Sequence, residues 1–120
     1  LLVQADDNKK YYMRVDTESS NMAVTSPFAM TDGKWHHFAV VIEPTSDGAQ
    51  TQVTYYFDHG DPVVKNANGS WYGLLHGNEI TLGEATSSLW FDEFRVTKGV
   101  LPKSKFMKAR NMSGFKISVR

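Results

Sequence analysis

The sequence predicts an all-β domain built from antiparallel strands. Short apolar segments recur along the chain, and Gly, Pro, Asn, Asp and Ser separate them at the spacing typical of such domains. The strongest segment is Trp-His-His-Phe-Ala-Val-Val-Ile, residues 35–42, which is rich in β-branched and aromatic side chains. No segment keeps the 3.6-residue apolar period of an amphipathic helix.

Alternation and turn residues place the individual elements. We expect Phe38, Val40 and Ile42 to enter the core from the strand over residues 35–42, because they share one parity. Residues 58–62 are expected to form a tight hairpin turn in which Gly60 takes a positive φ. The other predicted elements are strands over residues 11–16, 52–57, 80–83, 89–96 and 114–119, a polar loop over 65–79 and one short helical turn within 101–107.

Composition limits the classes of function. The 120 residues fit one domain, residues 1–120, and the 41% of hydrophobic residues can form a core without metal or disulfide support. Lys and Arg together number 13, as do Asp and Glu, so neither nucleic acid nor an anionic membrane surface is expected as a partner. The absence of Cys excludes disulfides and a zinc finger, and no apolar run is long enough for membrane insertion.

Three segments, in this order, resemble laminin-G-like domains, which are concanavalin A-like jelly rolls. Asp-Gly-Lys-Trp-His-His-Phe-Ala-Val, residues 32–40, is similar to the central strand of the family, and Tyr-Tyr-Phe-Asp-His-Gly, residues 55–60, is similar to the hairpin that follows. Residues 89–106 resemble the closing strand, with Asp92-Glu93, and the short turn after it. Two positions depart from the family: His59 is inserted before the hairpin glycine, and Trp90 replaces a small residue.

The resemblance implies an antiparallel β-sandwich of two curved sheets packed face to face. Family members are mostly sugar-binding, adhesion or accessory modules attached to larger secreted proteins. Their domains begin with strands that precede the segment matched by residues 1–15, so the resemblance implies a C-terminal fragment whose N-terminal strands are missing. We therefore expect the edge beside the closing strand, residues 114–119, to be covered by a second copy of the chain or by an adjoining segment of the parent protein.

A candidate sugar-binding patch lies in the predicted polar loop. Trp71 and Tyr72 are aromatic, and Asn68 and Asn78 flank them. Exposed aromatic rings stack on the faces of sugar rings, and amides nearby recognise the hydroxyl groups. The alternative is that Trp71 plugs one end of the sandwich.

Catalysis is not expected, and no catalytic residue is assigned. Glycoside hydrolysis needs paired carboxylates that project from one face, which requires an even spacing along a strand. Asp92 and Glu93 are adjacent on a predicted strand and therefore point to opposite faces. A hydrolase domain is for this reason the least favoured of the three functional classes considered.

Calcium is the one cofactor that the residues suggest. The ion takes about six to eight oxygen ligands, and Asp58 and Asp61 could supply two of them, although Asp is also a common turn residue. His36 and His37 are neighbours on a predicted strand, so we expect structural roles, with one ring in the core and the other on the outer face. Asp92 shares parity with apolar positions and is expected to be buried and hydrogen-bonded.

These features together predict a non-catalytic, carbohydrate-associated, lectin-like accessory domain of a secreted or cell-surface protein. The alternative is a structural or adhesion module that binds protein or spaces other domains. A test for polysaccharide binding separates the two, because only the first class requires a sugar site.

Overall fold

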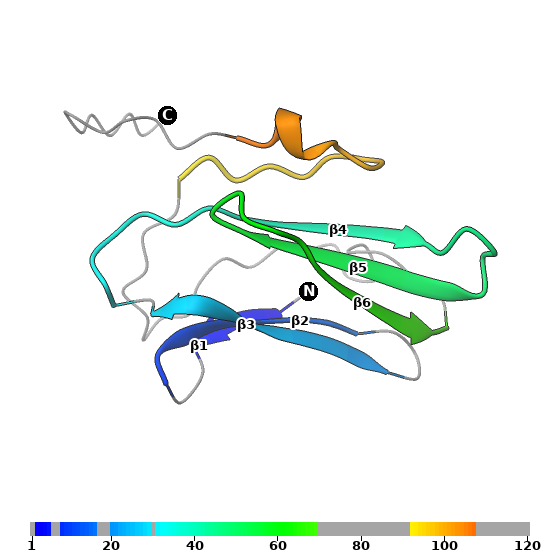
Figure 1. Ribbon diagram of the computed structural model, residues 1–120, viewed down its shortest axis with the longest axis horizontal. Coiled ribbons are helices and arrows are strands. Elements are labelled where there is room, and N and C mark those ends of the chain that lie inside the picture. The colour runs from blue at the N-terminus through cyan, green and yellow to red at the C-terminus, as the bar shows by residue number, and fades with distance from the viewer. Residues whose placement is uncertain (1, 6–7, 17–19, 30, 70–91, 108–120) are drawn as a thin grey trace.

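The computed structural model describes residues 2–5, 8–16, 20–29, 31–69 and 92–107, and their strands form two three-stranded antiparallel sheets (Figure 1). The first sheet has the order β1-β2-β3 and consists of β1 (Leu2–Ala5), β2 (Lys10–Asp16) and β3 (Asn21–Ala29). The second has the order β4-β5-β6 and consists of β4 (Phe38–Pro44), β5 (Gln50–Phe57) and β6 (Val63–Asn68). A short 3₁₀ helix, η1 (Lys103–Lys105), confirms the helical turn predicted within residues 101–107. The predicted all-β class is also confirmed.

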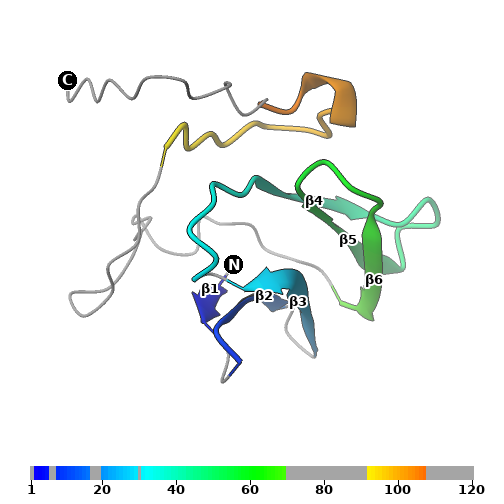
Figure 2. The ribbon, with the colours of Figure 1, turned by 60° about the vertical axis from the view of Figure 1, so that its left-hand side comes forward.

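The two sheets face each other across one apolar core (Figure 2). Buried side chains alternate along β2, where Met13 and Val15 are fully buried, because every second residue of a strand points to the same face. Tyr55 on β5 joins the layers directly, since its hydroxyl donates a hydrogen bond to the carbonyl of Met22 on β3 at 2.6 Å. The buried core consists of Met13, Val15, Met22, Val24, Val53, Tyr55, Phe57 and Ala67.

The face predicted for the central strand is confirmed, but the strand begins later than predicted. Phe38, Val40 and Ile42 all pack partly buried against the core. Phe38 pairs with Phe57, which is the last residue of β5. Residues 35–37 therefore have no strand residue opposite them and precede β4.

Strand β3 is not predicted by the sequence, because Pro27 interrupts its pattern. Proline has no backbone N–H and is tolerated in a sheet only at edges and irregularities. The pairing of β2 with β3 shifts register between Lys10 and Tyr12. At this point the buried Ser26 hydroxyl accepts a bond from the Tyr11 N–H at 3.1 Å and donates to the Phe28 carbonyl at 2.6 Å. The serine side chain thus bonds the backbone where the regular ladder is interrupted.

Residues 92–107 lie on the outer face of the second sheet, on the side away from the first sheet (Figures 1 and 2). Phe106 is 7% exposed and packs edge-on against Tyr56, with 5.0 Å between the ring centroids. The strand predicted over residues 89–96 is wrong in its described part, because residues 92–96 are not in a strand and Glu93 has a φ of 52°. Asp92 is exposed, so the predicted burial of its carboxylate is also wrong.

Two further predictions concern the second half of the chain. The polar loop predicted from residue 65 begins too early, because β6 continues to Asn68 with most of its side chains exposed along the edge of the sheet. The strands predicted over residues 80–83 and 114–119 lie outside the described residues. Within the described ranges, no helix combines the length and apolarity that a membrane crossing requires.

Candidate functional site

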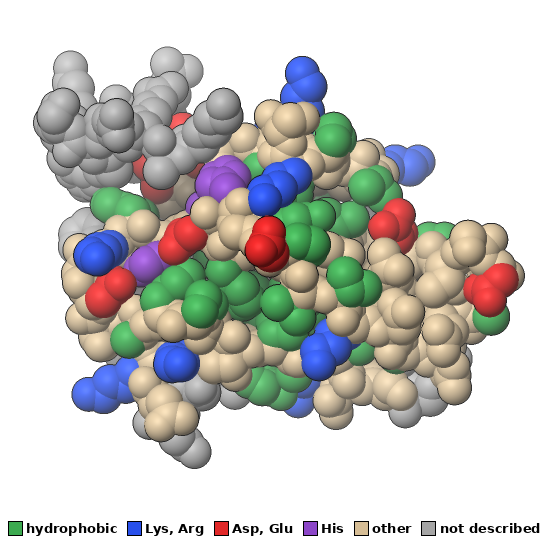
Figure 3. Space-filling view, in the orientation of Figure 1, with side chains coloured by type: hydrophobic (Ala, Val, Ile, Leu, Met, Phe, Trp, Pro, Cys, Tyr) green, Lys and Arg blue, Asp and Glu red, His purple; other side chains and the backbone are tan. Residues whose placement is uncertain are grey.

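Acidic and histidine side chains gather where the connection between β3 and β4 meets the turn between β5 and β6 (Figure 3). The pairing of Phe38 with Phe57 sets this meeting, since it places the residue before β4 beside the residue after β5. The Asp58 N–H accordingly donates to the carbonyl of His37 at 2.7 Å. We name Asp32, His36 and Asp58 the turn-end cluster.

His36 is the centre of the turn-end cluster. Its Nδ1 lies 2.7 Å from Oδ2 of Asp58, and its Nε2 lies 2.9 Å from Oδ2 of Asp32. The His36 side chain is only 7% exposed, and its ring stacks on Phe28 with 3.6 Å between centroids. Both ring nitrogens face carboxylates, an arrangement that gives two hydrogen bonds when each nitrogen carries a proton. The ring therefore links the connection between β3 and β4 to the turn between β5 and β6, and it packs both against the core.

Asp58 is held by the turn as well as by the histidine. Asp58 and His59 have φ values of 49° and 59°, and the Gly60 N–H bonds the Phe57 carbonyl at 2.8 Å. Two successive positive φ values with this bond are the features of a type I′ hairpin turn. The prediction that Gly60 takes the positive φ is wrong, because the two preceding residues, Asp58 and His59, take that conformation instead. Oδ1 of Asp58 also accepts the His37 N–H at 2.9 Å.

Asp32 fixes the other side of the turn-end cluster. Its Oδ1 accepts the Lys34 N–H at 2.9 Å, which closes a local turn through Gly33 at a φ of 75°. The Lys34 N–H, and after it the hydrogen bond and charge of the His36 ring, hold the pKa of the Asp32 carboxyl below its usual value. Asp32 is thereby kept as a carboxylate that faces the histidine.

The turn-end cluster does not supply the predicted calcium ligands in a suitable arrangement. Both oxygens of Asp58 accept bonds from nitrogen donors, and Asp61 is exposed beyond the turn. In the described part of the chain, no group of three or more His, Asp or Glu side chains is arranged to hold a metal ion.

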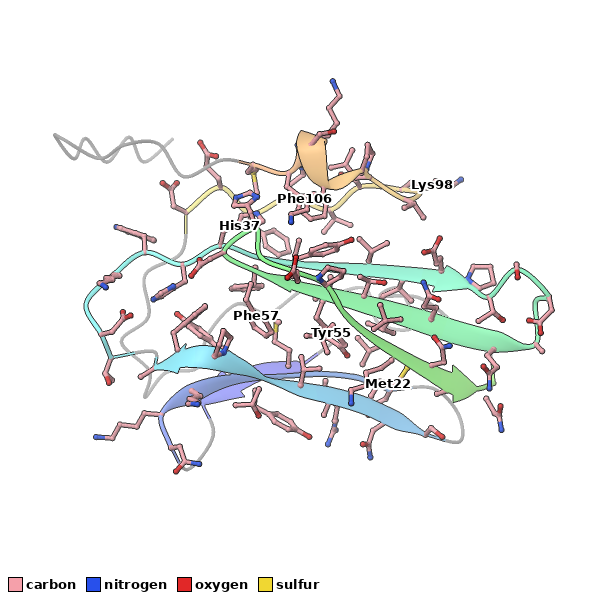
Figure 4. All side chains as sticks on the ribbon, in the orientation of Figure 1. Met22, His37, Tyr55, Phe57, Lys98 and Phe106 are labelled. Atoms are coloured by element: carbon pink, nitrogen blue, oxygen red, sulfur yellow. The ribbon has the colours of Figure 1, made fainter. Side chains whose placement is uncertain are left out.

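His37 lies on the opposite face from His36, as alternation along an extended chain predicts. Its ring stacks on His59 with 4.2 Å between centroids, and Phe106 lies beside both rings (Figure 4). Burial, and after it the neighbouring His59, lower the pKa of His37. The two adjacent histidine rings therefore lie in different environments. The His36 ring lies on the core side of the sheet, and the His37 ring lies beneath residues 92–107.

Of the four predicted sugar-binding residues, the structure describes only Asn68, which lies away from the turn-end cluster. Asn68 is at the opposite end of the second sheet, where it pairs with Gln50 and its Oδ1 accepts the Gln50 side-chain amide at 2.8 Å. Trp71, Tyr72 and Asn78 lie outside the described residues.

Sequence reasoning misses three residues of this region: Asp32, Trp35 and His59. Trp35 is 43% exposed on the loop that leads into β4. The pairing of strands 35–42 and 52–57 was available as a signal, because a hairpin places the residues before one strand beside those after the other.

Comparisons with models of protein families, with curated proteins and with solved structures found no match.

Proposed function

We propose that this chain is a non-catalytic carbohydrate-binding module of a secreted or cell-surface protein, with a laminin-G-like jelly-roll fold and a sugar site beside the turn-end cluster. One observation supports this most directly: Trp35 is 43% exposed between Lys34 and His36 in the chain. Both neighbours are fixed by Asp32, through the Lys34 N–H and the His36 ring. An exposed aromatic surface beside fixed polar groups is a combination that recognises sugars.

The loop that carries Trp35 is organised before any ligand binds. His36 is buried against Phe28 and bonded on both sides, so residues 32–36 are held at both ends of the loop. A preorganised loop loses little conformational entropy on binding, which favours weak polar ligands such as sugars. Each carboxylate oxygen has about two acceptor positions, so Asp32 and Asp58 can still accept bonds from hydroxyl groups.

The same geometry supports binding in place of catalysis. The carboxylates of Asp32 and Asp58 both bond the single ring of His36, and each also accepts a backbone N–H. A general acid and a general base act best when their environments push their pKa values apart. Two carboxylates that share one imidazole instead position the loop.

A glycan array followed by calorimetric titration tests the proposal. We expect the protein to bind at least one class of polysaccharide, and Trp35→Ala to weaken that binding by about tenfold, which corresponds to about 1.4 kcal/mol. Phe94→Ala is the matched control, because Phe94 is 55% exposed on another segment and should leave the affinity unchanged. Trp71→Ala tests the patch predicted from sequence. Binding lost only in Trp71→Ala would contradict a site at Trp35, and no binding to any glycan would contradict the function.

One observation favours the alternative function of a protein-binding adhesion module. Phe94 and Val96 are each 55% exposed and Val100 is 56% exposed, all on the segment that covers the second sheet. These three side chains lie within one short segment, residues 94–100, and exposed apolar patches mark protein interaction sites. A negative glycan array, together with retained binding to a matrix protein that Phe94→Ala weakens, would support this second function.

A further inference from the structure

Two histidine rings on the outer face of the second sheet have buried nitrogens without partners. His37 and His59 stack nearly parallel, at 4.2 Å between centroids and 14° between planes. Nδ1 of His37 and Nε2 of His59 are buried, and neither has a hydrogen-bond partner among the residues that the structure describes. Phe106 packs beside both, with its centroid 6.0 Å from His37 and 6.4 Å from His59 (Figure 4).

This environment accepts neutral rings and opposes charged ones. A neutral imidazole carries one proton, which can sit on the nitrogen that is not enclosed. A charged imidazolium carries a proton on both nitrogens, so a buried N–H would face no acceptor. Two charged rings stacked at 4.2 Å would also repel each other.

The charges around the pair do not reverse this preference. Asp58, from the turn, favours a charged His37, but its oxygens already accept bonds from the His36 ring and the His37 N–H. Arg95, from residues 92–107, opposes a charge on His37. Lys103, from η1, adds a further positive charge close by, where its Nζ bonds the Gly60 carbonyl at 2.8 Å. The adjacent His36 ring lies on the other face, against Phe28.

We propose that the His37–His59 pair is a pH-sensitive latch, which holds residues 92–107 on the second sheet while both rings are neutral and releases them when the rings are protonated. The direction follows from the linkage of protonation to docking. A released His37 takes up a proton at its ordinary pKa of 6.5, whereas the pKa of the docked His37 is lowered. Docking is therefore strongest above pH 6.5 and weakens as the pH falls below that value.

Release would change the surface of the molecule. Phe106 is buried at 7% exposure and covers Tyr56, so both rings would become accessible to solvent or to a partner. Through His37 the docking constant should fall by up to about tenfold per pH unit. This behaviour concerns the outer face of the second sheet and does not depend on sugar binding.

Distance measurements between nitroxide labels test the latch in the full chain. The sequence has no Cys, so Ser104→Cys in η1 and Ser46→Cys in the β4–β5 turn, both exposed positions, can be labelled specifically. We expect one narrow distance distribution at about pH 8 and a broad, longer distribution at about pH 5. A second pair, Thr25→Cys with Ser46→Cys, spans the two sheets and should give the same distance at both pH values.

Two variants in the first labelled pair assign the response to the histidines. His59→Asn removes the titrating ring, and Asn tolerates the φ of 59° at that position. His37→Phe keeps an aromatic surface beneath Phe106 and cannot titrate. Both variants should lose at least half of the pH-dependent change. The latch is overturned if the wild-type distribution is the same at both pH values, if the pair spanning the sheets changes as well, or if both variants keep the full response.

Discussion

Replacing Tyr55 with Phe tests how the two sheets are joined. Tyr55 is completely buried, and its hydroxyl donates to the Met22 carbonyl on β3 at 2.6 Å (Figure 4). The phenyl ring of the variant keeps the packing, so the substitution removes one hydrogen bond and leaves the carbonyl without this donor. We expect the free energy of unfolding near pH 7 to fall by about 1–2 kcal/mol.

The effect of Tyr55→Phe on the free energy of unfolding should change sign at high pH. Burial raises the pKa of Tyr55 to about 12, from an ordinary value of 10.0. Because the folded pKa is the higher one, the neutral phenol stabilises the fold fully below pH 10 and loses that effect between pH 10 and about 12. The shift corresponds to about 2–3 kcal/mol, which is more than the hydrogen bond supplies. The Phe variant cannot ionise at this position and should become the more stable protein at about pH 11.

Urea unfolding, followed by circular dichroism from neutral to alkaline pH, measures both effects. Tyr56→Phe is the matched control near pH 7, because Tyr56 lies on the other face of β5 and its packing against Phe106 is kept by a phenyl ring. That control should change stability by less than about 0.5 kcal/mol. Equal stabilities of wild type and Tyr55→Phe at neutral pH would refute the inter-sheet hydrogen bond. An offset that stays constant up to about pH 12 would refute the burial of the phenol.

Two further substitutions test the core register and the turn-end cluster by the same unfolding assay. Phe38→Ala should lower the free energy of unfolding by about 3 kcal/mol, which is at the lower end for a core aromatic because Phe38 is only partly buried. A loss below about 1 kcal/mol would contradict the packing of Phe38 against the core. Asp58→Ala should lower the free energy of unfolding by about 2–3 kcal/mol, since it removes the acceptors for His36 and His37 at a residue with positive φ. Asp58→Asn keeps an acceptor and tolerates that φ. It should therefore cost less than half as much. Equal losses in the two Asp58 variants would show that the hydrogen bonds and the backbone conformation contribute little.

Alternation predicted the parts of the fold that depend on one strand at a time. Phe38, Val40 and Ile42 of β4 face the core because a half-buried strand repeats every two residues. Alternation did not predict strand β3, because Pro27 and the buried Ser26 interrupt the apolar pattern where the register shifts.

Residues 92–96 show the opposite error, because the sequence predicts a strand that the structure does not contain there. Their alternation is typical of a strand, but a strand also needs a neighbour to pair with, and sequence does not reveal which backbone lies alongside. In the structure Glu93 takes a left-handed conformation and Asp92 is exposed. The local pattern alone therefore did not predict the conformation of this segment.

The turn-end cluster could be predicted only in part. The structural character of His36 and His37, and their opposite faces, follow from adjacency on an extended chain. The bond from His36 to Asp58 joins residues 22 positions apart, and it becomes visible only when the pairing of Phe38 with Phe57 is known. No local motif in the sequence marks Trp35 as exposed.

Chemical shift mapping by heteronuclear NMR tests the proposed sugar site most directly. The labelled protein would be titrated with soluble gluco-, manno-, galacto- and xylo-oligosaccharides and with sulfated glycosaminoglycan fragments. We predict that at least one of them shifts the amide signals of residues 32–37 and of Asp58 and His59, together with the indole N–H of Trp35. Shifts confined to residues 94–100, or none with any of these sugars, would contradict carbohydrate binding at the turn-end cluster.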